Sequence, residues 1–375
     1  MELVKLGKVA DFINGKAFKP SDWEDKGKKI IRIQNLNDCS KPYNRTSQNV
    51  EDKYLVYPND ILVSWSASLG VFEWKDSEIA VLNQHIFKVV PDEKLICKPY
   101  LKYALDKSID LMLKYTHGST MKHINRQEFL NIEIPLPPIA SQRRIANILD
   151  KADEIIRKRK EAIALTEQLL KSTFLDMFGD PVTNPKGWEK CQVKDIAKVK
   201  TGKTPSRKEN DNYGSSIRWV KTTEVINSII EETEEYLSEK GALQMNIFPE
   251  KTIIVAMYGQ GKTRGRTALL ANPSTTNQAC AAILPSCKYN TIYLWELLKL
   301  SYYRLRELGR GGNQPNLNLD MIKTFEIIFP PLENQEKFEN IITKIQIQRA
   351  KSMKSLEESE NLFNSLLQRA FKGEL

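Results

Sequence analysis

The sequence predicts an α+β protein in which two tandem globular domains are joined by two long helices that form an antiparallel intramolecular coiled coil. Three observations predict this: a duplication spanning the chain, a Pro-Pro pair closing each copy, and a long amphipathic helix after each pair. The chain has 375 residues, 41% hydrophobic and 27% charged, which is ordinary for two or three domains with packed cores.

The duplication consists of four matched features that recur in the same order. The first three are "VYPNDILVSW" with "IFPEKTIIVAM", an Asn-Gln pair before an apolar strand, and a helical stretch ending in a glycine turn. The fourth is "FLNIEIPLPPIASQ" with "TFEIIFPPLENQ". The offsets between matched residues are 191, 194 and 193 for Pro58 and Pro249, Asn83 and Asn277, and Gln142 and Gln335. A nearly constant offset indicates two copies, each with short strands, turns and one late helix before its Pro-Pro pair.

Long helices are expected over residues 139–178 and 332–375, directly after the two Pro-Pro pairs. Residues suited to a helix–helix seam recur in steps of 4 and 3 for four to five heptads, including polar members at Arg159 and Arg349. The seam of the first helix is Ile145, Leu149, Ala152, Ile156, Arg159, Ile163, Thr166, Leu170, Thr173 and Met177. The seam of the second is Phe338, Ile342, Ile345, Arg349, Ser352, Leu356, Ser359, Phe363, Leu366 and Ala370.

Each seam needs a partner, and the duplication supplies one within the same chain. If the domains bend away at opposite ends, the helices must run antiparallel, giving two domains held apart by a rod about 55 Å long at ~1.5 Å per residue. The alternative is that each helix packs only on its own domain.

One segment, "VAMYGQGKTRG", satisfies a loose phosphate-loop pattern at Ala256-x4-Gly261-Lys262-Thr263. A phosphate loop requires a helix after the glycines, whereas "RGRTALLANPSTTN" is typical of a strand and a turn. The matching stretch of the first copy lacks Gly-Lys-Thr, and a second loose match ending at Thr204 precedes a proline. We therefore interpret both matches as chance and expect a basic loop at a strand end.

Several loops combine basic residues with glycine, asparagine or glutamine, which suits contacts to phosphates and to guanine or adenine edges. For any single loop, a solvated surface turn is the competing interpretation, but corresponding loops occur in both copies. The candidate DNA-binding residues are Lys16, Lys19, Lys122, His123, Asn125, Arg126, Lys203, Arg207, Lys208, Lys262, Arg264, Arg266, Gln314 and Asn316.

The net charge of +9, most of it in residues 179–331, permits a nucleic-acid partner without requiring one. Acidic residues cluster in "EETEEYLSEK", which is compatible with an acidic face turned away from DNA. The five cysteines are scattered and only three histidines occur, so we expect reduced thiols and no metal site. With no long apolar run and no signal-peptide core, a cytoplasmic protein is expected.

The tandem copies, each closed by Pro-Pro-x-x-x-Gln in "PLPPIASQRRI" and "FPPLENQEKF", resemble the specificity subunit of type I restriction–modification systems. The approaches "GSTMKHIN" and "GGNQPNLN" fit the same family. One departure is that Ser141 and Asn334 stand before the glutamines where the family often has glutamate. The resemblance covers essentially the whole chain.

The resemblance implies target recognition domains over residues 1–138 and 179–331, with spacer helices over 139–178 and 332–375. Each domain would read one half of a split, asymmetric sequence in double-stranded DNA, and the helices would set the gap. Two methyltransferase subunits, and through them endonuclease subunits, would dock on this chain. S-adenosylmethionine, ATP and magnesium would be bound by those partners, with no cofactor on this chain.

The residues agree with a non-catalytic role, because neither an Asn-Pro-Pro-Tyr motif nor a glycine-rich cofactor loop opening a helix occurs. Two other functions remain as alternatives. One is a coiled-coil protein-interaction scaffold with no DNA role, and the other is a nucleotide hydrolase. Salt-sensitive retention on a DNA column would argue against the scaffold. Measurable nucleotide hydrolysis would be required to support the hydrolase.

Overall fold

The computed structural model describes residues 2–66, 68–115, 126–259, 261–309 and 316–375, and over 110–115 it describes the backbone only. The chain divides into two compact units. Unit 1 contains residues 1–160 and 354–375, and unit 2 contains residues 161–353. Each unit therefore contains one copy of the duplicated segment and one half of each long helix.

Unit 1 is built on a four-stranded antiparallel sheet in the order β2-β9-β6-β7. Its strands are Ala10–Asn14 (β2), Ile61–Ser64 (β6), Gly70–Glu73 (β7) and Ile86–Pro91 (β9). Phe12 and Phe87 on this sheet contact Phe129, with ring centroids 5.1 and 5.7 Å away. These rings belong to an apolar core that the sheet shares with the helices of the unit.

A second sheet of unit 1 has the order β4-β3-β8-β5, in which β3 and β8 run parallel. Its strands are Lys28–Ile31 (β3), Arg45–Thr46 (β4), Leu55–Val56 (β5) and Ala80–Leu82 (β8). Leu3–Lys5 (β1) pairs with Glu133–Pro135 (β10). The helices are Ile33–Asn37 (α1), Lys98–Tyr115 (α2) and Arg126–Leu130 (α3), with short 3-10 turns at Leu6–Lys8, Pro20–Asp22 and Asp52–Tyr54.

Unit 2 repeats this plan. Its first sheet has the order β12-β20-β17-β18-β15, and its second has the order β13-β16-β14-β19 with β14 and β19 parallel. The strands of the first are Val199–Thr201 (β12), Ile229–Ile230 (β15), Ile253–Ala256 (β17), Thr267–Leu270 (β18) and Cys280–Ile283 (β20). Those of the second are Tyr213–Gly214 (β13), Ile217–Val220 (β14), Tyr236–Leu237 (β16) and Ser274–Thr276 (β19).

The strand pair that closes unit 2 also has a counterpart in unit 1. Lys190–Gln192 (β11) pairs with Glu326–Ile328 (β21), as β1 pairs with β10. The helices are Val193–Ile196 (α5), Glu239–Ala242 (α6), Thr291–Leu300 (α7), Tyr302–Leu308 (α8) and Leu319–Lys323 (α9), with 3-10 turns at Asn210–Asn212 and Thr222–Glu224. The order β12-β20-β17-β18 repeats β2-β9-β6-β7, and the parallel pair β14-β19 repeats β3-β8, which supports a duplicated fold. The units also differ, because β15 adds a parallel strand to the first sheet of unit 2 and β13 replaces β5 in the second.

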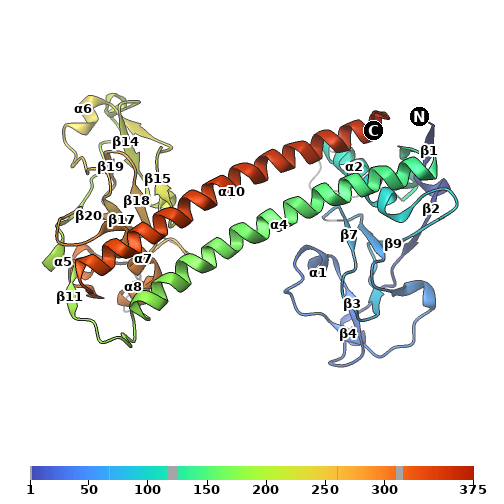
Figure 1. The fold of residues 1–375 in the computed structure, drawn as a ribbon, viewed down its shortest axis with the longest axis horizontal. Coiled ribbons are helices and arrows are strands. Elements are labelled where there is room, and N and C mark those ends of the chain that lie inside the picture. The colour runs from blue at the N-terminus through green and yellow to red at the C-terminus, as the bar shows by residue number, and fades with distance from the viewer. Residues whose placement is uncertain (1, 67, 116–125, 260, 310–315) are drawn as a thin grey trace. The chain divides into compact units, whose positions relative to one another are not determined.

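Two long helices pass through both units, Ile139–Phe178 (α4) and Leu332–Lys372 (α10). In unit 2 the end of α4 meets the start of α10, where the rings of Phe174 and Phe178 lie 5.5 and 5.4 Å from that of Phe338. In unit 1 the start of α4 meets the end of α10, where Leu149 and Leu367 share one apolar core. The helices therefore run antiparallel in each unit, as predicted (Figure 1).

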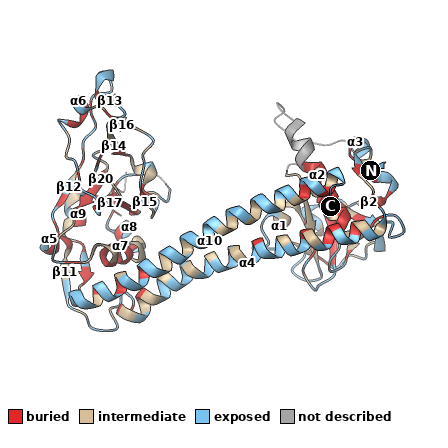
Figure 2. Ribbon diagram, turned by 45° about the horizontal axis from the view of Figure 1, so that its top comes forward, coloured by how far each residue is buried: buried red, intermediate tan, exposed pale blue. Residues whose placement is uncertain are grey.

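All members of both predicted seams are buried or half-buried, and most of their neighbours are exposed (Figure 2). The polar seam residue Arg349 forms an ion pair with Glu167 of α4, which explains an arginine at this position. Lys160 forms a second cross-helix ion pair with Glu360, at 2.8 Å. Each long helix also packs on the apolar core of both units, so the alternative in which each helix packs only on its own domain does not hold.

The glutamine of each Pro-Pro-x-x-x-Gln stretch attaches the start of a long helix to its unit. Gln142 is completely buried; its amide nitrogen donates to the carbonyls of Leu95 and Pro137 at 2.9 and 2.8 Å, and its oxygen accepts from the backbone of Cys97 at 2.8 Å. Gln335, also buried, makes two of the corresponding contacts in unit 2: its amide nitrogen donates to the carbonyl of Pro330 at 2.8 Å, and its oxygen accepts from the backbone N–H of Asn290 at 2.9 Å. An amide suits both contacts because it carries a donor and an acceptor.

Among the described residues, no helix combines the length and apolar composition needed to cross a membrane. All five cysteines are unpaired, and burial raises the pKa of the Cys280 thiol to about 12.

Candidate nucleic-acid interface

We call the sheet β2-β9-β6-β7 the main sheet of unit 1 and the sheet β12-β20-β17-β18-β15 the main sheet of unit 2. A glycine-lysine pair follows the first strand of the main sheet in both units. Gly15-Lys16 comes directly after β2, and Gly202-Lys203 directly after β12. The backbone N–H of Lys16 donates to the carbonyl of Leu82, and that of Lys203 to the carbonyl of Thr276, both at 2.9 Å. The two lysines therefore occupy equivalent places.

Close backbone approach explains both glycines. A Cβ atom on Gly15 would lie 2.0 Å from the carbonyl oxygen of Asn83, and one on Gly202 would lie 1.7 Å from that of Thr276. Any larger residue would force the strand end away from its neighbour. The flanking lysine is thus held at one defined position in each unit.

The Asn-Gln pairs that revealed the duplication form the turn beside each Gly-Lys pair. Asn277 stabilises its turn, because its Oδ1 accepts from the backbone N–H of Ala279 at 3.1 Å. The side chains of Gln84 and Gln278 are exposed, and Gln278 accepts a hydrogen bond from Thr204. We call each arrangement a Gly-Lys/Asn-Gln corner: residues 15–16 with 83–84, and residues 202–203 with 277–278.

The hairpin loop of each main sheet begins at the same corner. Trp65, the first residue after β6, donates its backbone N–H to His85, the residue after the Asn-Gln pair, at 3.3 Å. Met257, the first residue after β17, donates to Ala279 in the same way at 2.8 Å. Three segments that are distant in sequence therefore converge twice: a basic strand end, a polar turn and a hairpin loop.

The segment "VAMYGQGKTRG" is the hairpin loop of unit 2 and not a phosphate loop. The strands β17 and β18 on either side of it pair antiparallel, with Val255 opposite Thr267. A strand follows the loop where a phosphate loop requires a helix. Gly259, Gly261 and Gly265 adopt φ of 143°, 60° and 83°, a region that favours glycine.

The basic residues of this loop differ in exposure. Lys262 is exposed and Arg266 is half-buried, as a surface contact requires. Arg264 is only 8% exposed, so its placement differs from that expected of a residue at a DNA surface. Its carbonyl accepts a hydrogen bond from Arg306 at 3.2 Å. Alternation of basic and small residues along a loop does not reveal which side chains turn inward.

Arg207 also has a different environment from the one expected. It forms an ion pair with Glu235 at 2.7 Å, and its guanidinium lies 4.5 Å from the ring centre of Tyr213 and 5.1 Å from that of Trp219. Hydrogen bonding to Glu235 raises the pKa of Arg207, and the arginine lowers the pKa of Glu235. The acidic segment at Glu231–Glu235 is therefore not separate from the predicted basic loops, because it neutralises one of them.

The remaining candidates are spread over both units. Lys19, Lys203 and Lys208 are exposed, and Asn316 is half-buried beside Leu317, whose backbone N–H donates to Met257 at 3.0 Å. Arg126 is exposed, and its guanidinium donates to the carbonyl of Phe12 at 3.3 Å. The Nζ of Lys16 donates to Gln48 at 3.2 Å. Lys122, His123, Asn125 and Gln314 lie outside the described residues.

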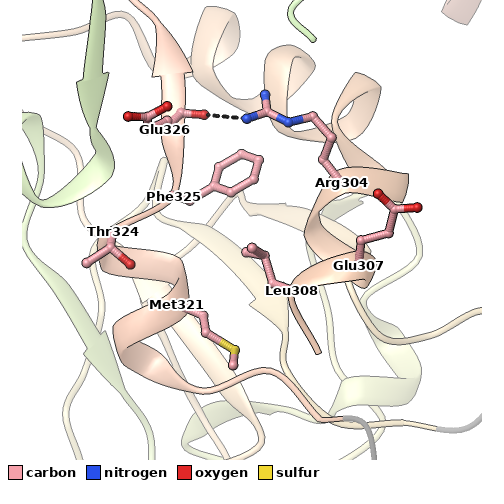
Figure 3. A pocket seen from close by; sticks show the side chains of 7 residues that line it. All are labelled: Arg304, Glu307, Leu308, Met321, Thr324, Phe325 and Glu326. Atoms are coloured by element: carbon pink, nitrogen blue, oxygen red, sulfur yellow. Dashed lines mark hydrogen bonds between the residues drawn. The ribbon is translucent and has the colours of Figure 1, made fainter. Parts of the chain in front are cut away.

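A pocket between α8, α9 and β21 shows an arginine whose role is structural (Figure 3). The guanidinium of Arg304 donates to the carbonyls of Pro181 and Glu326 at 3.3 and 3.4 Å, and it lies 5.0 Å from the ring centre of Phe325. These contacts attach α8 to β21. The two glutamine side chains at the corners, and Arg306 and Tyr303 on α8, were not among the residues selected from the sequence.

The chain matches the family model described as type I restriction modification DNA specificity domain over residues 1–165 and 185–358. The type I restriction enzyme MjaVIII specificity subunit of Methanocaldococcus jannaschii is 25% identical, covering 98% of this chain and 92% of that protein. The EcoBI specificity subunit of Escherichia coli is 22% identical, covering 99% and 85%.

Among solved structures, the S subunit of a type I restriction–modification system from M. genitalium aligns with a TM-score of 0.63 at 15% identity, covering 99% of this chain and 96% of that one. A structure of a type I R-M system aligns with a TM-score of 0.61 at 17% identity, covering 100% and 98%. These likenesses establish the shared fold. With the family model matching each copy of the duplication, the chain belongs to the type I restriction modification DNA specificity family.

Proposed function

We propose that this chain is the DNA-recognition subunit of a type I restriction–modification complex, and that it reads a split target with one half-site per unit. The observation that carries the proposal is the Gly-Lys/Asn-Gln corner, which occurs once in each unit at the same place in the fold. Two similar corners suit two similar tasks. The differing hairpin loops beside them suit two different half-sites.

The proposal assigns two different kinds of DNA contact to the residues at and beside each corner. Lysines neutralise phosphates and set the register on the duplex, whereas sequence is read by side chains that reach base edges. Lys16 and Lys203 are identical in the two units, so we assign them to the phosphates that every half-site shares. Loops that differ, such as "WSASL" after β6 and the glycine-rich loop after β17, are assigned to contacts that only one of the two half-sites makes.

The paired helices would set the unread gap between the half-sites. In support, α4 has 40 residues and α10 has 41, and both are continuous. At ~1.5 Å per residue each helix is about 60 Å long. Linking two recognition sites raises the effective concentration for the second only when the link matches the spacing, which makes the gap part of the target.

Partner subunits would supply the chemistry. Relatives of this chain are named specificity subunits of restriction enzymes, and a similar fold occurs in a type I R-M system. We propose that methyltransferase subunits dock on this chain and that endonuclease subunits associate through them. S-adenosylmethionine, ATP and magnesium would then bind to those partners.

The test is the salt dependence of DNA binding by the full-length chain, measured by fluorescence anisotropy with a mixed-sequence duplex. Each of Lys16→Ala and Lys203→Ala is expected to reduce the slope of log K against log salt by about 0.9, the value for one phosphate contact. Lys344→Ala, an exposed lysine of α10, is the matched control and should leave the slope unchanged. Binding that is absent or insensitive to salt would contradict the proposal and favour a protein-interaction scaffold.

A further inference from the structure

A basic pocket lies between the hairpin loop of unit 2 and α8. It has a volume of about 370 Å³ and is lined by Lys262, Arg266, Arg306, Tyr302, Tyr303 and Asn227, with Gly261 at its edge. Three of these side chains are cationic and none is acidic. The pocket combines residues of the glycine-rich loop with residues of a helix some forty positions later.

The positive charge of this hairpin pocket is not neutralised within the part of the chain that the structure describes. There, Lys262, Arg266 and Arg306 form no ion pair with an acidic side chain. Arg306 donates from Nη1 to two neutral oxygens, the Arg264 carbonyl at 3.2 Å and the Tyr302 hydroxyl at 2.9 Å, so its charge is retained. By contrast, Arg207 of the same unit is paired with Glu235. Three like charges around one cavity favour an anionic ligand.

The pocket is held in shape by contacts between its walls. The hydroxyl of Tyr302 donates to the carbonyl of Lys262 at 2.8 Å, which fixes α8 to the loop. Asn227 adopts a φ of 64°, and its Oδ1 accepts from the backbone of Thr267 at 3.0 Å. A Cβ atom on Gly261 would meet nothing within 4 Å, so the backbone at the rim is open to a ligand.

An exposed aromatic side chain adjoins the three cations. Tyr303 is 77% exposed, and its ring centre lies 5.2 Å from that of Tyr302. Large exposed aromatic side chains beside basic residues are typical of surfaces on which nucleotides stack, because every base has an aromatic face. Cationic donors at the same site suit the phosphate oxygens of a nucleotide, with which they form charge-assisted hydrogen bonds.

We propose that the hairpin pocket binds a phosphate group of the DNA strand and that Tyr303 packs against the adjoining sugar or base. The proposal rests on the function proposed above and adds a site that the Gly-Lys/Asn-Gln corners do not include. The hairpin loop of unit 1 reads "WSASL" and contains no lysine or arginine, so it offers no counterpart of Lys262 and Arg266. The half-site read by unit 2 therefore gains phosphate contacts that the other half-site does not have.

The test compares the full-length chain with the double variant Lys262→Gln/Arg266→Gln in anisotropy titrations of a mixed-sequence 30-base-pair duplex. Loss of two phosphate contacts should reduce the salt slope by nearly 2 and weaken binding by roughly fiftyfold or more at 0.1 M salt. The charge-conserving variant Lys262→Arg/Arg266→Lys should retain the slope, which separates loss of charge from misfolding. Tyr303→Ala should weaken binding and leave the slope unchanged, since it removes no charge.

Three comparisons distinguish the ways in which the proposal could fail. If Lys203→Ala changes the slope and the double variant does not, the hairpin pocket contacts no DNA phosphate while the proposed function stands. If the wild-type chain shows no salt-dependent binding at all, the proposed function itself fails. The pocket could instead take its phosphate group from a small molecule in solution. Titration with adenosine monophosphate and with inorganic phosphate, followed by thermal shift, tests this. A wild-type thermal shift lost in the double variant, with an unchanged DNA slope, would assign the pocket to a free nucleotide and overturn the proposal.

Discussion

Lengthening both long helices together should change the gap between the two half-sites and leave the half-sites themselves unchanged. Because the helices are antiparallel, the insertions must lie opposite each other to keep the seam in register. The ion pairs of Lys160 with Glu360 and of Glu167 with Arg349 show which positions face each other. Insertions after Glu161 in α4 and after Leu356 in α10 satisfy this condition.

The size of the insertion follows from helix geometry. Three heptads add 21 residues, which is about 32 Å at ~1.5 Å per residue. One turn of B-DNA is about 34–36 Å and 10–10.5 base pairs, so the displaced half-site would face nearly its original direction. The preferred gap should therefore increase by about 9–10 base pairs. A single heptad adds only about 10 Å, or roughly three base pairs, and turns the half-site by about 100° around the duplex, so weaker binding is expected.

The assay is selection of bound duplexes from a random pool by the purified full-length chain, followed by sequencing. It requires no partner subunit, so altered docking of a methyltransferase cannot produce the shift. A matched control carries the 21 residues in α4 alone, which leaves the added seam without a partner and should abolish any selected split motif. A lengthened chain that still selects the original gap would refute the account of the helices as a spacer.

Three further predictions concern residues whose environments are defined within one unit. Gln335→Ala should lower the free energy of unfolding of unit 2 by about 2–4 kcal/mol. The buried carbonyl of Pro330 loses its hydrogen-bond partner at a cost of about 1–3 kcal/mol, and the N–H of the half-buried Asn290 loses its partner at a smaller cost. The exposed Gln348→Ala should change the free energy by less than about 0.5 kcal/mol, and urea denaturation checks both variants. Gly202→Ala should displace the lysine that follows it and weaken DNA binding at least as much as loss of that lysine, and equal affinity for wild type and variant would contradict the close backbone approach. Burial raises the pKa of Cys280 to about 12, so its thiolate is scarce at pH 8. Cys280 should therefore remain unmodified by a thiol reagent at that pH, while the exposed Cys287 reacts. Peptide mapping by mass spectrometry distinguishes the two cysteines.

The parts of the fold that depend on periodicity could be predicted from the sequence. A seam spaced by 4 and 3 residues specifies which face of a helix is covered, and the duplication supplied the partner helix. The rejection of the phosphate loop also followed from local pattern, because the residues after Thr263 are typical of a strand and a turn and not of a helix. The helix seam and the strand after the hairpin loop are determined by residues that are close in sequence. They can therefore be predicted from a single sequence.

The candidate site was less predictable because its geometry depends on segments that are distant in sequence. Nothing near Arg207 in the sequence indicates that Glu235 neutralises it, and nothing in "GKTRGR" indicates that Arg264 turns inward. Arg306 was overlooked because its helix meets the hairpin loop only in the folded unit. Gln84 and Gln278 belong to the Asn-Gln pair that occurs in both copies of the duplication. This repetition is the sequence feature that could have identified them as candidate functional residues.

The central claim is that two recognition units on paired helices read one split DNA target. It is tested most directly by expressing the chain with its cognate methyltransferase subunit in a host that lacks DNA methylation, and mapping modified bases across the genome. The account predicts a single motif with two unequal halves and a fixed gap. A continuous motif, or no modification by a methyltransferase shown to be active with another specificity chain, would contradict it.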